Sequence, residues 1–146
     1  MVNDNTMKYG GIDILLSNAG AAPQALPLNM DAENLRQSFD INFFAHFHLV
    51  QAIGRLFVAQ GNIGQKLFNT SKQAVNSGWN FGAYGLPKAT LMFLVKQLAL
   101  ELGEHGIRVN GVNADRIRSG ILNGKVIANR SKVRSLQWRS ICRVIC

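Results

Sequence analysis

Cysteine is scarce in this sequence. The chain has two cysteines, Cys142 and Cys146, and both lie among its last five residues. They enclose no segment that could form a core, and no histidine or further cysteine stands near them at the spacing of a zinc site. The sequence therefore predicts neither a disulfide framework nor a bound metal. The low cysteine content also favours a reducing cytoplasm as the location of the protein.

Long apolar runs are missing too. The sequence has no stretch of about eighteen consecutive apolar residues, so we expect no transmembrane helix. Its first residues, Met-Val-Asn-Asp-Asn-Thr, lack the charged and apolar regions of a signal peptide. A chain of 146 residues is long enough to bury a hydrophobic core, and it corresponds to one domain or to a piece of one.

Acidic residues are missing from the last part of the chain. Residues 125–146 carry six Lys and Arg and no Asp or Glu, whereas residues 1–124 carry ten Lys and Arg and eight Asp and Glu. Most of the formal net charge of +8 therefore lies in the tail. A basic tail can bind nucleic acid non-specifically, but a solvated end explains the same composition. We expect no nucleic-acid function and a poorly packed tail.

Three short apolar runs alternate with two long helix-forming stretches. Strands are expected near 12–16, 66–70 and 107–112, and helices near 32–60 and 84–103. The order strand, helix, strand, helix, strand predicts an α/β fold with a parallel sheet and right-handed crossovers. The first helix is apolar over a wide arc, which indicates a buried helix or one that packs on a partner.

Tyr84 and Lys88 stand four residues apart at the start of the second helix, so their side chains share one face. Pro87 fits only the first turn of that helix, where its missing N–H is no loss. A free tyrosine titrates near ~10, and a neighbouring ammonium lowers that pKa, which would let the phenol exchange a proton with a substrate oxygen. Ser71 ends the second strand and could hydrogen-bond the same oxygen. A Tyr/Lys pair of this spacing also occurs in purely structural helices, so the pair alone leaves the role open.

Four motifs follow one another in an order and at separations that resemble the short-chain dehydrogenase/reductase family. They are Ser17-Asn18-Ala19-Gly20, Phe39-Asp40-Ile41-Asn42, Ser71 with Tyr84 and Lys88, and Gly106-Ile107-Arg108-Val109-Asn110-Gly111-Val112-Asn113. The resemblance covers about residues 9–124. It implies a Rossmann fold and hydride transfer between NAD or NADP and a small alcohol or carbonyl substrate.

The resemblance also implies a role for each site residue. Tyr84 is the acid/base, and Lys88 lowers its pKa and holds the nicotinamide ribose hydroxyls. Ser71 orients the substrate carbonyl, and Asn42 holds a water of the proton relay. The turn Asn18-Ala19-Gly20 passes close to the adenosine ribose of the cofactor.

The first half of a dinucleotide-binding fold is not recognisable in the sequence. No glycine-rich fingerprint follows a strand, so neither a phosphate-binding helix N-terminus nor the acidic residue that selects NAD over NADP can be identified. We expect residues 1–124 to form a partial doubly wound sheet that lacks this glycine-rich half, and the isolated chain to have little or no activity. The family implies a homo-oligomer through helices 32–60 and 84–103. The alternatives are a non-catalytic remnant or a helix-mediated dimerisation module.

Two details resemble the dehydrogenase half of aldolase-fused members of the family. They are Tyr84-Gly-Leu-Pro-Lys88 and Val112-Asn113-Ala-Asp-Arg-Ile-Arg-Ser-Gly120, in which Ala114-Asp115 stands where most members have Pro-Gly. The resemblance ends after about Arg134. One choice of codons for the tail, read in another frame, gives a sequence like the continuation of an aldolase-fused member. We therefore expect residues 125–146 to be poorly ordered or a frameshift product, and the chain to be a gene fragment.

Two further groups of residues lie near these motifs. His46 and His48 are two apart, which places them on different helix faces, and we interpret both as structural. Trp79-Asn80-Phe81 precedes Tyr84 and either lines a substrate mouth or pins the loop.

Overall fold

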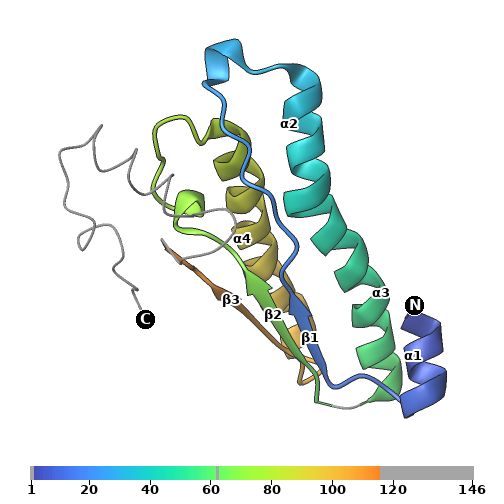
Figure 1. Ribbon diagram of the computed structural model, residues 1–146. Helices are drawn as coiled ribbons and strands as arrows, with labels where there is room; N and C mark the ends of the chain where they lie inside the picture. Colours follow the sequence, from blue (N-terminus) through green and yellow to red (C-terminus); the bar gives the residue numbers. More distant parts are fainter. Residues whose placement is uncertain (1, 62, 116–146) are drawn as a thin grey trace. The chain divides into compact units, whose positions relative to one another are not determined.

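A computed structural model describes residues 2–61 and 63–115 (Figure 1). The chain divides into two compact units, Met1–Val112 and Asn113–Cys146. All helices and strands of the described residues belong to the first unit. The predicted basic tail at 125–146 lies outside the described residues.

Three parallel strands form one sheet in the order β1-β2-β3. The strands are β1 (Ile14–Ser17), β2 (Gln65–Asn69) and β3 (Arg108–Val112), which confirms the predicted parallel α/β architecture. β1 begins later than expected because the backbone N–H and C=O of Ile12 bond to the side-chain amide of Gln60, both at 3.2 Å.

One long helical stretch connects β1 to β2 and contains a wider turn in its middle. Helix α2 (Ala32–Phe39) continues directly into the π-helix η2 (Asp40–Phe44) and then into α3 (Ala45–Gln60). Gly61 ends the stretch with a φ of 64°, a left-handed conformation that glycine adopts without strain. The predicted helix at 32–60 is confirmed, with the π-turn centred on Asn42.

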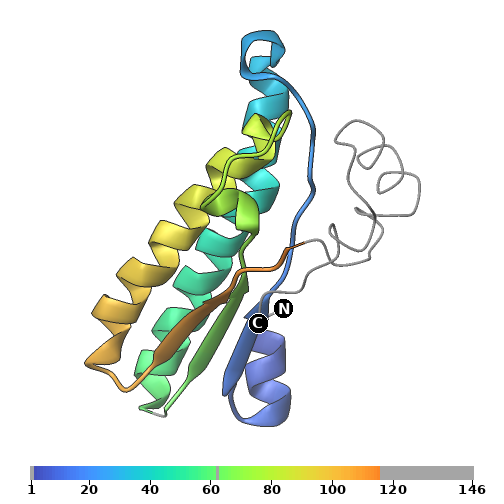
Figure 2. The same cartoon turned by 90° about the vertical axis from the view of Figure 1, so that its left-hand side faces the viewer.

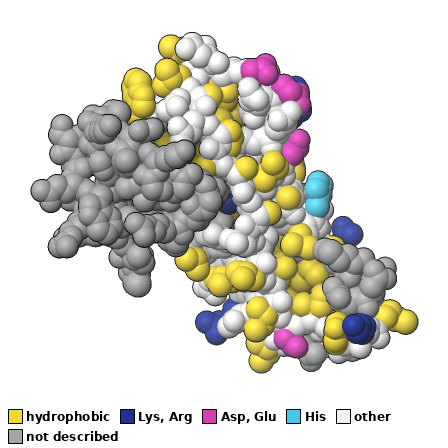
Figure 3. Space-filling model, in the orientation of Figure 1, with side chains coloured by type: hydrophobic (Ala, Val, Ile, Leu, Met, Phe, Trp, Pro, Cys, Tyr) yellow, Lys and Arg dark blue, Asp and Glu magenta, His cyan; other side chains and the backbone are white. Residues whose placement is uncertain are grey.

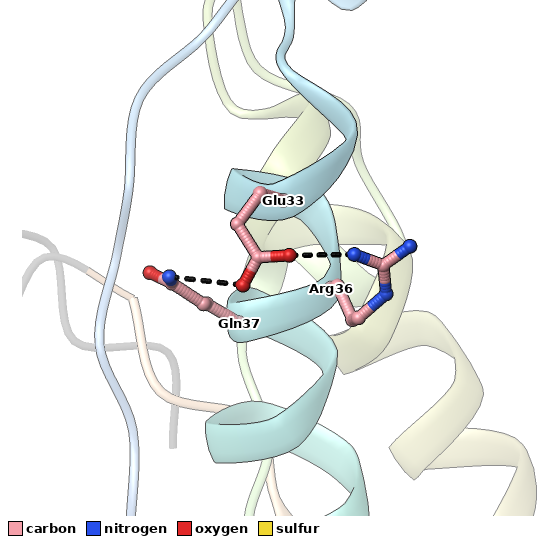
Figure 4. A network of polar contacts seen from close by, with 3 residues as sticks. All are labelled: Glu33, Arg36 and Gln37. Atoms are coloured by element: carbon pink, nitrogen blue, oxygen red, sulfur yellow. Dashed lines mark hydrogen bonds and ion pairs between the residues drawn. The ribbon is translucent and has the colours of Figure 1, made fainter.

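The first turns of α2 carry a small polar network on the surface (Figure 4). The carboxylate of Glu33 accepts hydrogen bonds from Arg36 at 2.5 Å and from Gln37 at 3.2 Å. Such pairs three and four residues apart stabilise an exposed helix by a few tenths of a kcal/mol each, roughly 0.2–0.5. Asp31 occupies the N-cap position, but its side chain makes no capping bond.

Helix α4 (Gly82–Gly103) connects β2 to β3 and begins two residues before the predicted start. Pro87 therefore lies inside the helix rather than in its first turn, which corrects the expectation from the sequence. The remaining described helices are short: α1 (Val2–Tyr9) and the 3-10 helices η1 (Pro27–Asn29) and η3 (Lys72–Ala74). Among the residues that the structure describes, no helix is long and apolar enough to cross a membrane.

Helices α3 and α4 cover the same face of the sheet (Figure 2). The hydrophobic core lies between these two layers and contains Leu15, Val50, Ile53, Phe57, Phe68, Leu91, Val95, Ile107 and Val109. On the other face, the side chains of Ile14 and Leu16 are 67% and 63% exposed. In Figure 3, hydrophobic side chains accordingly reach the surface over the region where Figure 1 shows the sheet.

Candidate active site

The predicted site residues come together at the carboxyl edge of the sheet. The turn Asn18-Ala19-Gly20 leaves β1, Ser71 follows β2, and Tyr84 and Lys88 lie in the first two turns of α4. Asn42 reaches the same place from η2. In open parallel sheets, ligands bind at this edge, outside the carboxyl ends of the strands.

The hydroxyl of Ser71 is hydrogen-bonded to the phenol of Tyr84. Ser71 is also the N-cap of η3, and its Oγ accepts the backbone N–H of Gln73 at 3.2 Å. This backbone bond fixes the Ser71 side chain, which is buried, and so holds its hydroxyl at the partly buried phenol. The two residues that the sequence assigned to proton transfer and substrate orientation are therefore in direct contact.

The pKa of Tyr84 is raised, not lowered as the Tyr/Lys spacing led us to expect. Burial disfavours the phenolate and is the larger cause, while the hydrogen bond from Ser71 acts in the opposite direction. The Lys88 ammonium nitrogen lies 5.9 Å from the centroid of the Tyr84 ring. As it stands, Tyr84 is a protonated phenol at neutral pH and thus a proton donor.

Lys88 is almost fully buried and faces the end of β2. Its side chain is 3% exposed, and its Nζ donates a hydrogen bond to the carbonyl of Asn69 at 3.0 Å. Burial lowers the pKa of Lys88 to about 8. The ammonium group is therefore held in place by the sheet itself and lies next to the β1 exit turn: a Cβ added to Gly20 would stand 3.5 Å from it.

Asn42 is completely buried and ties the π-turn to the segment after β1. Its Oδ1 accepts the N–H of Ala21 at 3.2 Å, and its Nδ2 donates to the carbonyl of Ala21 at 2.9 Å and to that of Ser38 at 3.0 Å. The Nδ2 group also lies 3.1 Å from the hydroxyl of Ser38. The oxygen and the nitrogen of the Asn42 amide thus both have partners within the protein. The relay water that the resemblance implies for Asn42 stays a prediction.

The turn Asn18-Ala19-Gly20 is exposed and open to a ligand. The side chain of Asn69 donates a hydrogen bond to Oδ1 of Asn18 at 2.6 Å, which joins the ends of β1 and β2. The Oδ1 atom of Asn69 is buried without a hydrogen-bond partner. An exposed small-residue turn, a buried cation and an unpaired acceptor therefore stand side by side at this edge.

Comparisons with known proteins agree with this geometry. A family model described as enoyl-(acyl carrier protein) reductase matches residues 1–141. A solved short-chain type dehydrogenase/reductase from Mycobacterium marinum superimposes with a TM-score of 0.82 and 30% identity, over 90% of this chain and 52% of that one. This chain belongs to the short-chain dehydrogenase/reductase family.

Two further relatives show how much of a family member the chain contains. The 7alpha-hydroxysteroid dehydrogenase of Escherichia coli K12 is 34% identical over 137 residues, which is 94% of this chain and 52% of that protein. Carveol dehydrogenase from Mycobacterium avium, solved in complex with NAD, has a TM-score of 0.83 and 25% identity, over 93% of this chain and 49% of that one. The chain spans about half the length of the curated relatives it matches.

The site fits one half of a dinucleotide cofactor. The nicotinamide ribose hydroxyls of such a cofactor would find a cation in Lys88. Gly20 allows close approach to the backbone of the turn, because a Cβ there would stand 3.3 Å from Oδ1 of Asn42 and 3.5 Å from Nζ of Lys88. The pyrophosphate site is different. Within residues 2–61 and 63–115, no glycine-rich turn links a strand to a helix N-terminus, so these residues offer no recognisable cradle for the phosphates.

His46 is a site residue whose role the sequence did not reveal. It is 1% exposed, its Nε2 lies 2.9 Å from the carbonyl of Ala19, and its Nδ1 lies 2.6 Å from the hydroxyl of Ser17. Because a carbonyl only accepts, Nε2 carries the hydrogen, and Nδ1 of the neutral ring accepts from Ser17. Burial and the charge of Lys88 lower the pKa of His46, while its bond to Ala19 acts the other way. His46 is thus structural, as expected, but what it holds is the predicted cofactor turn.

The loop before α4 is tied to the segment after β1. The N–H of Ala25 donates to the carbonyl of Asn80 at 3.1 Å, and Ala25 and Phe81 form an isolated parallel bridge. Asn80 adopts a positive φ of 65°, whereas Trp79 is 76% exposed. The sequence left open whether this stretch lines a substrate mouth or holds the loop in place. For Asn80 and Phe81 these contacts favour the second interpretation.

Proposed function

We propose that this chain provides the proton-transfer part of an NAD(P)-dependent oxidoreductase site that acts on a small alcohol or carbonyl compound. The observation that carries the proposal is the Ser71–Tyr84 hydrogen bond beside the buried ammonium of Lys88. Family membership supports the reaction class, and the NAD in the carveol dehydrogenase complex supports the cofactor class.

In the proposed reaction, NAD or NADP would supply or accept the hydride. The hydroxyls of Ser71 and Tyr84 would bind the substrate oxygen together. In the reducing direction Tyr84 donates its phenolic proton to that oxygen, and in the oxidising direction the phenolate takes the proton back. Lys88 stabilises the phenolate through its charge and would hold the ribose hydroxyls. Asn42 and the turn Asn18-Ala19-Gly20 would keep the cofactor side of the site in place.

The proposal is tested by cofactor binding to the 146-residue chain, followed by amide chemical shifts. Added NAD or NADP should shift the amides of the turn Asn18-Ala19-Gly20 and of Tyr84 and Lys88. Lys88→Met should weaken this response, whereas Lys96→Met, on the exposed side of α4, should leave it unchanged. A folded chain that shows no shifts at saturating cofactor, or shifts only elsewhere, would contradict the proposal and favour a non-catalytic module.

We also propose that the protein is a homo-oligomer that associates through helices 32–60 and 84–103. On α4, Leu86, Phe93 and Leu100 are 51%, 68% and 77% exposed and recur every seven residues, which places them along one side of the helix. Ile41 and Phe44 of η2 are 44% and 41% exposed. Large exposed apolar side chains that recur along one side of a helix are typical of a helix that packs on a partner.

The narrower assignments of the sequence analysis are part of the same proposal. A relation to aldolase-fused members of the family is supported by Tyr84-Gly-Leu-Pro-Lys88 and by the stretch Val112-Asn113-Ala-Asp-Arg-Ile-Arg-Ser-Gly120. The domain is proposed to extend over residues 1–124, with a basic tail at 125–146. A reducing cytoplasm is the proposed location, supported by the cysteine content.

A further inference from the structure

Pro87 creates a hydrogen-bonding problem inside α4. A proline in a helix interior has no N–H to donate to the carbonyl four residues earlier, which here is the carbonyl of Ala83. Ala83 is fully buried, so water does not satisfy that carbonyl, and a buried unpaired carbonyl costs free energy. The position matters because Tyr84 follows Ala83 and Lys88 follows Pro87.

Ser38 supplies the missing donor from another helix. Its Oγ donates a hydrogen bond to the carbonyl of Ala83 at 2.7 Å, although the two residues lie 45 positions apart in the sequence. Ser38 belongs to α2 and is 2% exposed. The bond therefore links the end of α2 to the first turn of α4 through a dry contact.

The same hydroxyl is held from the other side by Asn42. The Nδ2 atom of Asn42 lies 3.1 Å from Oγ of Ser38, and the amide of Asn42 is anchored on both backbone groups of Ala21. A continuous series of hydrogen bonds thus runs from the segment after β1, through Asn42 and Ser38, to the helix that carries Tyr84 and Lys88.

We propose that Ser38 is a positioning residue: its hydroxyl replaces the N–H that Pro87 lacks and so fixes the start of α4, which carries Tyr84 to Ser71 and Lys88 to the end of β2. The consequence for catalysis rests on the proposed function. The hydrogen bond and its dependence on Pro87 do not, and they can be measured in a protein without activity.

The decisive experiment is a double-mutant cycle between Ser38→Ala and Pro87→Ala. Alanine at position 87 restores an N–H for the carbonyl of Ala83, and Asn42 keeps the carbonyls of Ala21 and Ser38 as acceptors. Ser38→Ala should therefore lower the urea midpoint of the chain when Pro87 is present and leave it nearly unchanged in the Pro87→Ala background. Ser38→Thr, which keeps a hydroxyl, should retain most of the wild-type midpoint.

A spectroscopic readout separates positioning from stability alone. In a Tyr9→Phe background, Tyr84 is the remaining tyrosine, and its ionisation is followed by the absorbance of tyrosinate. Ser38→Ala should loosen the burial that raises the pKa of Tyr84 and so shift its titration toward lower pH. Pro87→Ala should reverse this shift. In a catalytically active protein, Ser38→Ala should lower kcat on the order of 10- to 100-fold, as misplacement of reacting groups does.

The outcomes are distinguishable. If Ser38→Ala folds only together with Pro87→Ala, the proposal is supported, because the second change repairs the first. An equal loss in both backgrounds, or an unchanged Tyr84 titration in folded Ser38→Ala, would overturn it. The double-mutant cycle could show the expected coupling in a protein that neither binds cofactor nor turns over substrate. That result would overturn the proposed function and leave the role of Ser38 in fixing α4 standing.

Discussion

The ammonium nitrogen of Lys66 lies 5.3 Å from the ring centroid of Phe57, in the middle of the hydrophobic core. Lys66 is 1% exposed, and its Nζ has no hydrogen-bond partner. In the sheet it stands between Leu15 and Val109, both core residues. The glycine at position 54 leaves room for it, since a Cβ there would come within 2.8 Å of its Nζ. A buried amine without a partner is a cost that the rest of the core must offset.

Lys66→Met should therefore stabilise the protein, by roughly 1–3 kcal/mol at neutral pH. Burial lowers the pKa of Lys66 to about 8, whereas the unfolded chain keeps a value near 10.5. Between these two pH values the unfolded state binds more protons, so the stability of the wild type rises with pH across this window. The advantage of Lys66→Met should shrink over the same range. Urea unfolding at several pH values measures it.

Lys96→Met provides the matched control, because Lys96 is exposed on α4. It should change the free energy of unfolding little at any of these pH values. A Lys66→Met variant that is less stable than the wild type at neutral pH would show that the cation–π contact with Phe57 outweighs the cost of burial.

A second prediction concerns His46, whose ring joins Ser17 to the carbonyl of Ala19. His46→Leu leaves the buried hydroxyl of Ser17 and the carbonyl of Ala19 without their partner and should cost roughly 1–3 kcal/mol. The pKa of His46 is lowered from 6.5, so the unfolded state binds more protons as the pH falls toward and below that value. The stability of the wild type should accordingly decrease on acidification through this range, and His46→Leu should remove that part of the decrease.

His48→Leu is the comparison for His46, because His48 is exposed two residues further along the same helix. Unfolding curves at neutral and mildly acidic pH distinguish the two. If the loss of folding stability on acidification persists unchanged in His46→Leu, other titratable groups cause it.

The sequence predicted the arrangement of the fold better than the energetics of the site. Apolar runs and helix-forming stretches are local signals, and they located three strands and both long helices. The motif spacings also predicted that Ser71 lies near Tyr84, because the ends of parallel strands meet at one edge of a sheet. The predicted direction of the shift in the Tyr84 pKa was wrong, since the spacing of Tyr84 and Lys88 contains no information about burial.

The remaining differences arise from contacts between distant segments. Pro87 could lie in the second turn of α4 because Ser38, from another helix, satisfies the carbonyl that the proline leaves free. His46 could not be assigned to Ser17 and Ala19 because nothing in the local sequence pairs them. The sequence predicted that Lys66 belongs to a strand. The burial of its side chain depends on α3, which covers the sheet and comes from a distant segment.

A third prediction tests association through the helices. Phe93→Asp puts a charge in the middle of the stripe formed by Leu86, Phe93 and Leu100, and should shift the protein toward the monomer in sedimentation or light-scattering measurements. Leu28→Asp, at an apolar residue of η1 that is 97% exposed and lies outside this stripe, should leave the mass unchanged. A monomeric wild type at all concentrations would contradict the proposed oligomer.

The last prediction concerns the bond between Ser71 and Tyr84. This bond favours the phenolate, whereas burial disfavours it, so Ser71→Ala should raise the pKa of Tyr84 further. Ser77→Ala, at an exposed serine of the following loop, is the control and should leave the pKa unchanged. The titration is read from tyrosinate absorbance in a Tyr9→Phe background. Because the folded pKa of Tyr84 is already above its unfolded value near ~10, folding stability should fall as the pH rises through that value, and more so in Ser71→Ala. A pKa of Tyr84 that falls in Ser71→Ala would show that the serine does not stabilise the phenolate, and the proposed division of roles between the two hydroxyls would then be wrong.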